Sequence, residues 1–114
     1  MQDRLGNKVR LQHILDAAQE IMNYTEGIDF DTFSNNSMMY NACVRQLEVI
    51  GEASNRLTRE IHEHNPQIPW RTIIGLRNIL IHEYFGVDDK IVWTVIQQEI
   101  PSLILNVETV LLNA

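Results

Sequence analysis

The stretch Leu11-Gln12-His13-Ile14-Leu15-Asp16-Ala17-Ala18-Gln19-Glu20-Ile21-Met22 carries the pattern that decides the fold class. Its apolar residues recur at intervals of three and four, which places them on one face of an α-helix. Asn7 is a suitable cap and Gly27 a suitable stop, so the spacing predicts a helix over about residues 7–26. The apolar face comprises Leu11, Ile14, Leu15, Ala18, Ile21 and Met22.

Helical spacing continues beyond this first segment. Residues 28–34 are polar and are predicted to form a loop. A second helix is expected to begin near position 34 or 35 and to end at Asn65 and Pro66. Gly51 falls inside it, where glycine costs about 1 kcal/mol relative to alanine. The close approach of a neighbouring helix would explain that glycine.

Three further helical segments follow. Pro69 suits the first turn of a third helix, which Gly86 would break. Asp88 or Asp89 can cap a fourth, and Pro101 begins or kinks the last. No segment alternates apolar and polar residues, as a half-buried strand would. The sequence therefore predicts an all-α, up-down bundle of four to five helices.

The 114 residues correspond to a single domain, residues 1–114. The net charge of −6 and the pI of about 5.0 would repel phosphate backbones at long range, so any RNA contact needs a local basic spot. The single cysteine, Cys43, excludes an internal disulfide, suits a cytoplasmic location and is expected to be a small buried hydrophobe. No apolar run approaches the roughly 20 residues of a membrane span.

Three polar residues, Arg77, Asn78 and His82, are embedded in the most apolar predicted helix. Asn78 and His82 are four apart and share a face. Arg77 and His82 are five apart, about 140° around an ideal helix, so their side chains diverge. Two geometries could bring them together. The helix could end or distort near His82, or two copies of it could face each other in a homodimer with a composite site.

These residue types suit metal-independent cleavage of RNA, in which the 2′-OH attacks the adjacent phosphate. Histidine can transfer protons at neutral pH. Arginine binds phosphate oxygens through two hydrogen bonds. Asparagine can orient either the histidine or the phosphate. An Arg and a His five residues apart also arise often by chance, so the spacing alone favours a structural or interface role over catalysis.

The motif also resembles a known family. Arg77-Asn78-Ile79-Leu80-Ile81-His82-Glu83-Tyr84 matches the Arg-x4-His-x-Tyr motif of the HepT-like branch of the HEPN superfamily. The resemblance spans nearly the whole chain. It includes Arg45-Gln46-Leu47-Glu48-Val49-Ile50-Gly51-Glu52-Ala53, Ile68-Pro69-Trp70-Arg71, Ile74-Gly75-Leu76 and Tyr84-Phe85-Gly86-Val87-Asp88.

The resemblance implies a homodimer paired through the motif helices. It implies the toxin of a type II-like HEPN/MNT toxin–antitoxin system, a ribonuclease without metal or cofactor in which Arg77 and His82 are catalytic and Asn78 accompanies them. The partner would be an MNT-type nucleotidyltransferase that transfers AMP to Tyr84 and so blocks RNA. The alternative is a non-catalytic helical dimer that binds nucleotide or a nucleotidyltransferase.

Other polar and aromatic residues have simpler interpretations. His62 and His64 point apart on a helix and are expected on the solvated surface rather than at a shared metal. Arg45 and Glu52 could pair within the bundle or line the dimer cleft. The large aromatic residues are expected to pack in the core rather than to stack on bases, namely Phe30, Phe33, Trp70 and Trp93.

Overall fold

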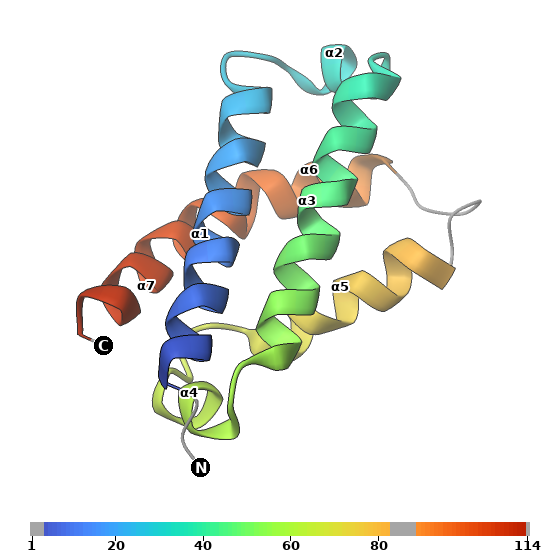
Figure 1. The fold of residues 1–114 in the computed structure, drawn as a ribbon. Helices are drawn as coiled ribbons and strands as arrows, with labels where there is room; N and C mark the ends of the chain where they lie inside the picture. Colours follow the sequence, from blue (N-terminus) through green and yellow to red (C-terminus); the bar gives the residue numbers. More distant parts are fainter. Residues whose placement is uncertain (1–3, 83–88, 114) are drawn as a thin grey trace.

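The computed structural model describes residues 4–82 and 89–113, with side chains for residues 5–76 and 89–113. Every regular element in these ranges is a helix (Figure 1), so the predicted all-α class is confirmed. Five helices have ten or more residues and two are short. In chain order they are α1 (Arg4–Thr25), α2 (Phe30–Ser34), α3 (Ser37–Arg56), α4 (Arg59–His64), α5 (Trp70–His82), α6 (Asp89–Gln98) and α7 (Ile100–Leu112).

Helix α3 lies at the centre of the arrangement. It packs against α1 on one flank and against α5 on another, while α1 also packs against α7. The short α2 contacts both α3 and α6. Figure 1 shows α1 and α3 side by side, with α6 and α7 crossing behind them. The helix that carries the motif, α5, is therefore supported mainly by α3.

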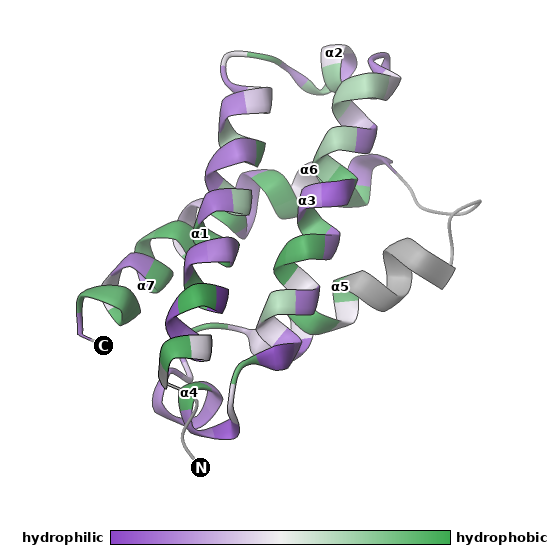
Figure 2. Ribbon diagram, in the orientation of Figure 1, coloured by the Kyte–Doolittle hydropathy of each residue, from purple (hydrophilic) through white to green (hydrophobic). Residues whose placement is uncertain are grey.

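The core forms where these helices meet. Figure 2 shows α1 mostly hydrophilic on the face turned to the viewer, α3 mixed, and mainly apolar residues where α6 and α7 cross behind them. Burial of this apolar surface is the main stabilising contribution, about 25 cal/mol per Å². The predicted face of the first helix is confirmed, because its members are buried or packed against the core. They are Leu11, Ile14, Leu15, Ala18, Ile21 and Met22.

The first helix begins earlier than predicted. It starts at Arg4, so Asn7 is not its cap. Asn7 is buried within α1, and its amide bonds with Thr58, the N-cap residue of α4. The expected stop is confirmed, because Gly27 adopts a φ of 73° two residues after the helix ends, a region that glycine enters without strain.

The predicted loop over residues 28–34 contains a helix, α2, so that prediction was wrong. Asp29 caps it by accepting a hydrogen bond from the backbone N of Thr32 at 2.9 Å. Phe33 is fully buried, with its ring 5.0 Å from Trp93 and 5.7 Å from Tyr40, between ring centroids. A helix this short is stable only through such tertiary packing.

The single helix predicted from about residue 34 to residue 65 is two helices, α3 and α4. Its start differs little, because Asn36 caps α3 by accepting from the backbone N of Met39. The chain becomes extended at Leu57, whose ψ is 149°, and α4 resumes at Arg59. The break buries Leu57 and lets Thr58 reach Asn7. Helical periodicity persists across the break, which is why the sequence does not reveal it.

The later helices begin where the sequence predicted. The backbone N of Ile73 donates to the Pro69 carbonyl at 3.0 Å, which forms the first turn of α5. Helix α6 starts at Asp89, and Pro101 lies in the first turn of α7. The other two residues predicted at helix ends, Gly86 and Asp88, lie outside the described residues. None of the helices over residues 4–82 and 89–113 is both long and apolar enough to cross a membrane.

Candidate functional site

Helix α5 carries three of the residues singled out by the sequence. It is helical without a break from Trp70 to His82, so Arg77, Asn78 and His82 all lie in its C-terminal half. Their side chains are outside the described set, and Tyr84 is outside the described residues altogether. The structure thus places the backbone of the trio on one helix and leaves the predicted roles as predictions.

The regular course of α5 has a geometric consequence. Because the interval from Arg77 to His82 is helical, the two positions are separated by about 140° around the helix axis. Positions 78 and 82 share a face, since they are four residues apart. Positions 77 and 82 of one α5 helix therefore do not share a face, and a site that used both residues would need a further element beside α5.

The first half of α5 is anchored firmly. Trp70 and Ile73 are buried, and the Trp70 indole N donates to the Asn65 carbonyl at 3.1 Å. The His62 ring lies 5.0 Å from the Trp70 ring, between centroids, and its Nε2 is 2.9 Å from the Ser54 carbonyl oxygen. His62 is therefore part of the packing, and its predicted place on the solvated surface was wrong. His64 is exposed, as expected.

The remaining aromatic and thiol predictions are confirmed. The rings of Phe30 and Phe33 lie 6.2 and 5.0 Å from that of Trp93, so these aromatic residues pack against one another. Cys43 is fully buried, and this burial raises the pKa of its thiol to about 11. Since the thiolate is the nucleophile, Cys43 has no catalytic character. The described residues contain no cluster of three or more His, Cys, Asp and Glu suited to a metal ion.

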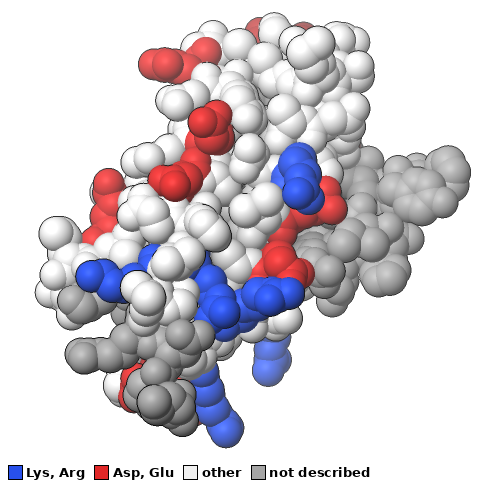
Figure 3. Space-filling view, in the orientation of Figure 1, with Lys and Arg blue, Asp and Glu red and all other residues white. Residues whose placement is uncertain are grey.

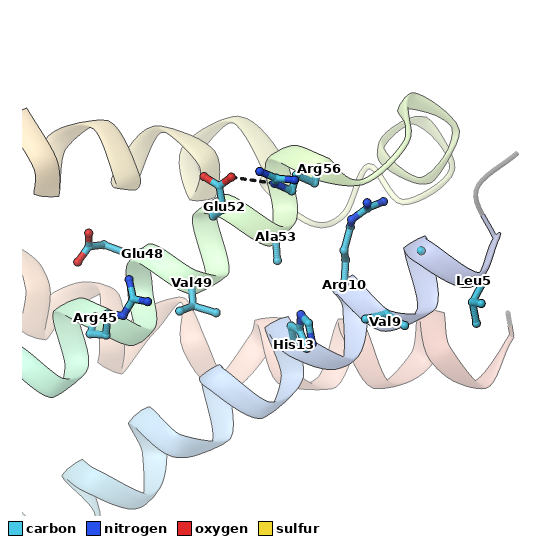
Figure 4. Close-up of a pocket in the computed structure, with 11 residues that line it drawn as sticks. Leu5, Val9, Arg10, His13, Arg45, Glu48, Val49, Glu52, Ala53 and Arg56 are labelled. Atoms are coloured by element: carbon cyan, nitrogen blue, oxygen red, sulfur yellow. Dashed lines mark hydrogen bonds and ion pairs between the residues drawn. The ribbon is translucent and has the colours of Figure 1, made fainter. Parts of the chain in front are cut away.

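A groove between α1 and α3 is the feature that the sequence reasoning missed (Figure 4). Its volume is about 810 Å³. Arg45 and Glu52 both line it, and Glu52 accepts a hydrogen bond from Arg56 Nε at 2.8 Å rather than pairing with Arg45. Leu5 and Val9, four apart on α1, were the signal in the sequence. The lining consists of Leu5, Gly6, Val9, Arg10, His13, Arg45, Glu48, Val49, Glu52, Ala53 and Arg56.

Charge is distributed unevenly over this face. Figure 3 shows most of the Lys and Arg of this face gathered over the half where α1 begins and α3 ends, with some Asp and Glu among them, whereas the half nearer α2 carries mainly Asp and Glu. The groove is lined by three arginines and two glutamates, in a chain whose net charge is −6. It is therefore a local region of mixed, slightly basic character on an acidic protein.

Comparison with known proteins identifies the family. The family model described as Ribonuclease HepT-like matches residues 14–110. The chain is 41% identical over 103 residues to a candidate RNase of Methanocaldococcus jannaschii, covering 90% of this chain and 94% of that protein. It is 42% identical over 101 residues to a candidate RNase of Caldanaerobacter subterraneus subsp. tengcongensis, covering 89% and 90%.

A third relative bears the family name. The chain is 38% identical over 98 residues to the "Probable ribonuclease HepT" of Thermococcus cleftensis, covering 86% of this chain and 89% of that protein. No solved structure matches significantly. The family match covers most of the chain, including Arg77, Asn78 and His82 on α5. This chain therefore belongs to the HepT-like ribonuclease family.

Proposed function

We propose that the protein is an endoribonuclease that cuts RNA without a metal ion and acts as the toxin of a HEPN/MNT toxin–antitoxin pair. The observation that supports this most directly is the family match across residues 14–110, which includes Arg77, Asn78 and His82. The relatives in that family are named as ribonucleases. The role of toxin rests on the resemblance of the motif.

The proposed reaction is an internal transfer. The RNA 2′-OH loses its proton to one histidine and attacks the neighbouring phosphorus, while a second acid gives a proton to the departing 5′ oxygen. The products are a 2′,3′-cyclic phosphate and a 5′-OH end. Arg77 would stabilise the negative charge on the phosphoryl oxygens. Asn78, on the same helix face as His82, would orient the imidazole.

The proposed site is composite, with two copies of α5 at a dimer cleft. Positions 77 and 82 lie about 140° apart around one helix. Arg77 and His82 of the same copy are therefore poorly placed to contact the same phosphate. A two-fold related copy supplies a second His82, so one imidazole can accept a proton while the other donates. This requires a homodimer.

Cleavage of a labelled RNA in the presence of EDTA tests the proposal. The wild type is expected to give cyclic-phosphate and 5′-OH ends, and His82→Ala is expected to lose roughly 10²-fold or more in rate. His64→Ala is a matched control, because His64 is exposed on α4 and far along the chain from the motif. Intact RNA with wild-type protein, or equal cleavage by His82→Ala, would refute the proposal.

Neutralisation is proposed to occur at Tyr84. A nucleotidyltransferase partner would form a phosphodiester between the tyrosine oxygen and the α-phosphate of ATP, releasing pyrophosphate. The added bulk and negative charge beside Arg77 and His82 would exclude an RNA phosphate. Intact mass after incubation with partner and ATP should rise by one AMP, and Tyr84→Phe should abolish the increase. If the mass of Tyr84→Phe still rises by one AMP, another residue is the AMP acceptor.

The acidic charge favours a second candidate, a non-catalytic helical dimer that binds nucleotide or the nucleotidyltransferase. A net charge of −6 disfavours long-range attraction of RNA. In that case Arg77→Ala would lower the affinity for nucleotide or partner while the wild type leaves RNA intact. Measuring both binding and cleavage with the same variant separates the two candidates.

A further inference from the structure

Helix α5 differs in charge from the rest of the chain. Of the helices that the structure describes, it is the only one without Asp or Glu, and it carries Arg71, Arg77 and His82. The chain as a whole has a net charge of −6. RNA binding to an acidic protein requires a local basic surface, because contacts to the phosphates come mainly from Lys and Arg. Helix α5 provides such a surface.

Four residues of α5 lie on one face of the helix. Arg71, Gly75, Asn78 and His82 are separated by intervals of four, three and four residues, so in a continuous helix they fall within about 60° around the axis. The buried Ile73 lies about 200° from Arg71, on the side that packs against the core. The face that carries Asn78 and His82 therefore continues toward the start of α5, opposite the core. We call these four residues the α5 outer face.

Arg71 is exposed on this face and has no partner in the chain. Within residues 5–76 and 89–113 its side chain forms no ion pair or hydrogen bond. By contrast, Arg56 and Arg59 are each paired with a glutamate four residues away. The positions four residues before and after Arg71 are Gln67 and Gly75, which carry no charge. The guanidinium of Arg71 is therefore available to bind a phosphate group through two hydrogen bonds.

Gly75 leaves a gap in the same face. Glycine is unfavourable in the middle of a helix, and a close neighbour is the usual structural reason for it. A Cβ added at Gly75 would meet nothing within 4 Å among the described residues, so the chain itself does not supply that neighbour. A position without a side chain lets the backbone of another molecule approach the helix closely. A strand that extends from His82 along this face would pass over Gly75 before it reached Arg71.

The spacing along the helix sets what Arg71 can contact. At 1.5 Å per residue, Gly75 is about 10 Å and Arg71 about 16 Å from His82 along the axis. Arg71 is therefore too far from His82 to bind the same phosphate, but it can bind another phosphate of the same strand. The absence of acidic residues from α5 favours a polyanion over a protein surface here, and the face is continuous with the candidate site.

We propose that the α5 outer face binds the ribose-phosphate backbone of the RNA beside the cleavage position. Gly75 admits the strand close to the helix, and Arg71 binds a phosphate other than the one that is cut. The proposal rests on the proposed function, since it takes Asn78 and His82 as the place of the reacting phosphate. It adds two substrate-binding residues that lie outside the motif.

Removal of the Arg71 charge tests the phosphate contact. Fluorescence anisotropy measures the Kd for a labelled single-stranded 2′-O-methyl RNA, which lacks the attacking hydroxyl and stays intact with wild-type protein. Arg71→Gln is expected to raise the Kd roughly three- to tenfold at low salt. It should also lower the slope of log Kd against log salt concentration by about 0.7, the value for one phosphate of a single strand. Arg59→Gln, an equal charge change on α4, should alter neither.

A side chain added at Gly75 tests the close approach. Gly75→Leu is expected to raise the Kd for the 2′-O-methyl RNA roughly tenfold, since the leucine would occupy the path of the strand. It should not lower the stability in urea unfolding, because the new Cβ meets no neighbour and leucine favours a helix. Thr109→Leu, at an exposed position of α7, is the control for an added exposed apolar side chain and should bind RNA normally.

The kinetics of cleavage distinguish substrate binding from a structural role. With unmodified RNA, Arg71→Gln should raise KM and leave kcat within about twofold of the wild type, because a phosphate away from the reaction is bound equally in the ground and transition states. The proposal is overturned if the wild type does not bind the 2′-O-methyl RNA, or if either Arg71→Gln or Gly75→Leu binds it with wild-type affinity. It is also overturned if either variant changes the oligomeric state in sedimentation velocity, because the face would then be a protein contact.

The same measurements separate this proposal from the catalytic one. If the wild type binds the 2′-O-methyl RNA through Arg71 and Gly75 but leaves unmodified RNA intact, the α5 outer face is an RNA-binding surface and the ribonuclease proposal fails. If the wild type cuts RNA while Arg71→Gln and Gly75→Leu bind and cut as it does, the ribonuclease proposal stands and the RNA-binding role of this face fails.

Discussion

Asn7 and Thr58 lie 51 positions apart in sequence and are joined by two hydrogen bonds. The Asn7 Nδ2 donates to the Thr58 hydroxyl at 3.0 Å, and the Thr58 backbone N donates to Asn7 Oδ1 at 3.2 Å. Thr58 makes no side-chain cap bond of its own to α4. The buried side-chain amide of Asn7 therefore supplies the hydrogen-bond partner of the Thr58 backbone N at the start of α4 and links α4 to α1.

Replacing Asn7 with leucine should destabilise the protein. The change removes the partner of both the Thr58 backbone N and the Thr58 hydroxyl, and the loss of one such half-buried hydrogen bond costs about 0.5–1.5 kcal/mol. Urea unfolding followed by circular dichroism measures the change in the free energy of unfolding. Asn23→Leu is the matched control, because Asn23 is an exposed residue of the same helix. Equal losses for the two variants would contradict a specific role for the Asn7 bonds.

The histidines of α4 should differ in their effect on stability. His62 lies against Trp70 and bonds to the Ser54 carbonyl oxygen, so His62→Ala should lower the free energy of unfolding by about 1–2 kcal/mol. His64 is exposed, and His64→Ala should stay within roughly 0.5 kcal/mol of the wild type. Denaturant unfolding at constant pH compares them. If His62→Ala leaves the free energy of unfolding unchanged, the contacts of His62 do not contribute to stability.

Two glycines should respond oppositely to alanine. A Cβ added at Gly75 would meet nothing within 4 Å, and alanine favours a helix interior by roughly 1 kcal/mol, so Gly75→Ala should stabilise the protein. Gly27 adopts a φ of 73°, so Gly27→Ala should destabilise it by roughly 1 kcal/mol. Thermal unfolding at matched protein concentration measures both. A loss of stability in Gly75→Ala would indicate that another molecule approaches α5 there.

The cap of α2 should make stability depend on pH in the acid range. The backbone hydrogen bond from Thr32 lowers the pKa of the Asp29 carboxyl below the ordinary value for an aspartate. Because the folded pKa is depressed, the stabilisation is present above the unfolded pKa and is lost as pH falls through the folded one. Asp29→Asn keeps a capping oxygen but does not titrate.

The difference in unfolding free energy between the wild type and Asp29→Asn should therefore shrink as the pH falls below about 4. Urea unfolding from pH 6 to pH 2 measures it. Asp31→Asn is the comparison, since Asp31 is an exposed residue of the same helix for which no side-chain cap bond is formed. A difference that stays constant over this range would contradict the role assigned to Asp29.

Part of the candidate site on α5 could be predicted from the amino-acid sequence alone. Helical spacing, together with Pro69, predicted where α5 begins, and the polar trio stood out because it interrupts an apolar helix. The resemblance then identified the family. The same spacing could not show what faces Arg77 and His82, because a partner helix contributes nothing to the local pattern.

Local sequence determined the all-α class, the face of α1 that is buried and the starts of α5 and α7. Helical periodicity and proline act within a few residues, so their effects are visible without the fold. Only the tertiary structure decided that Asn7 serves α4 rather than α1, that the chain breaks at Leu57, and that Arg45 and Glu48 share an open groove. Those outcomes depend on contacts between segments distant in sequence, whose energies outweigh the local preferences of the residues involved.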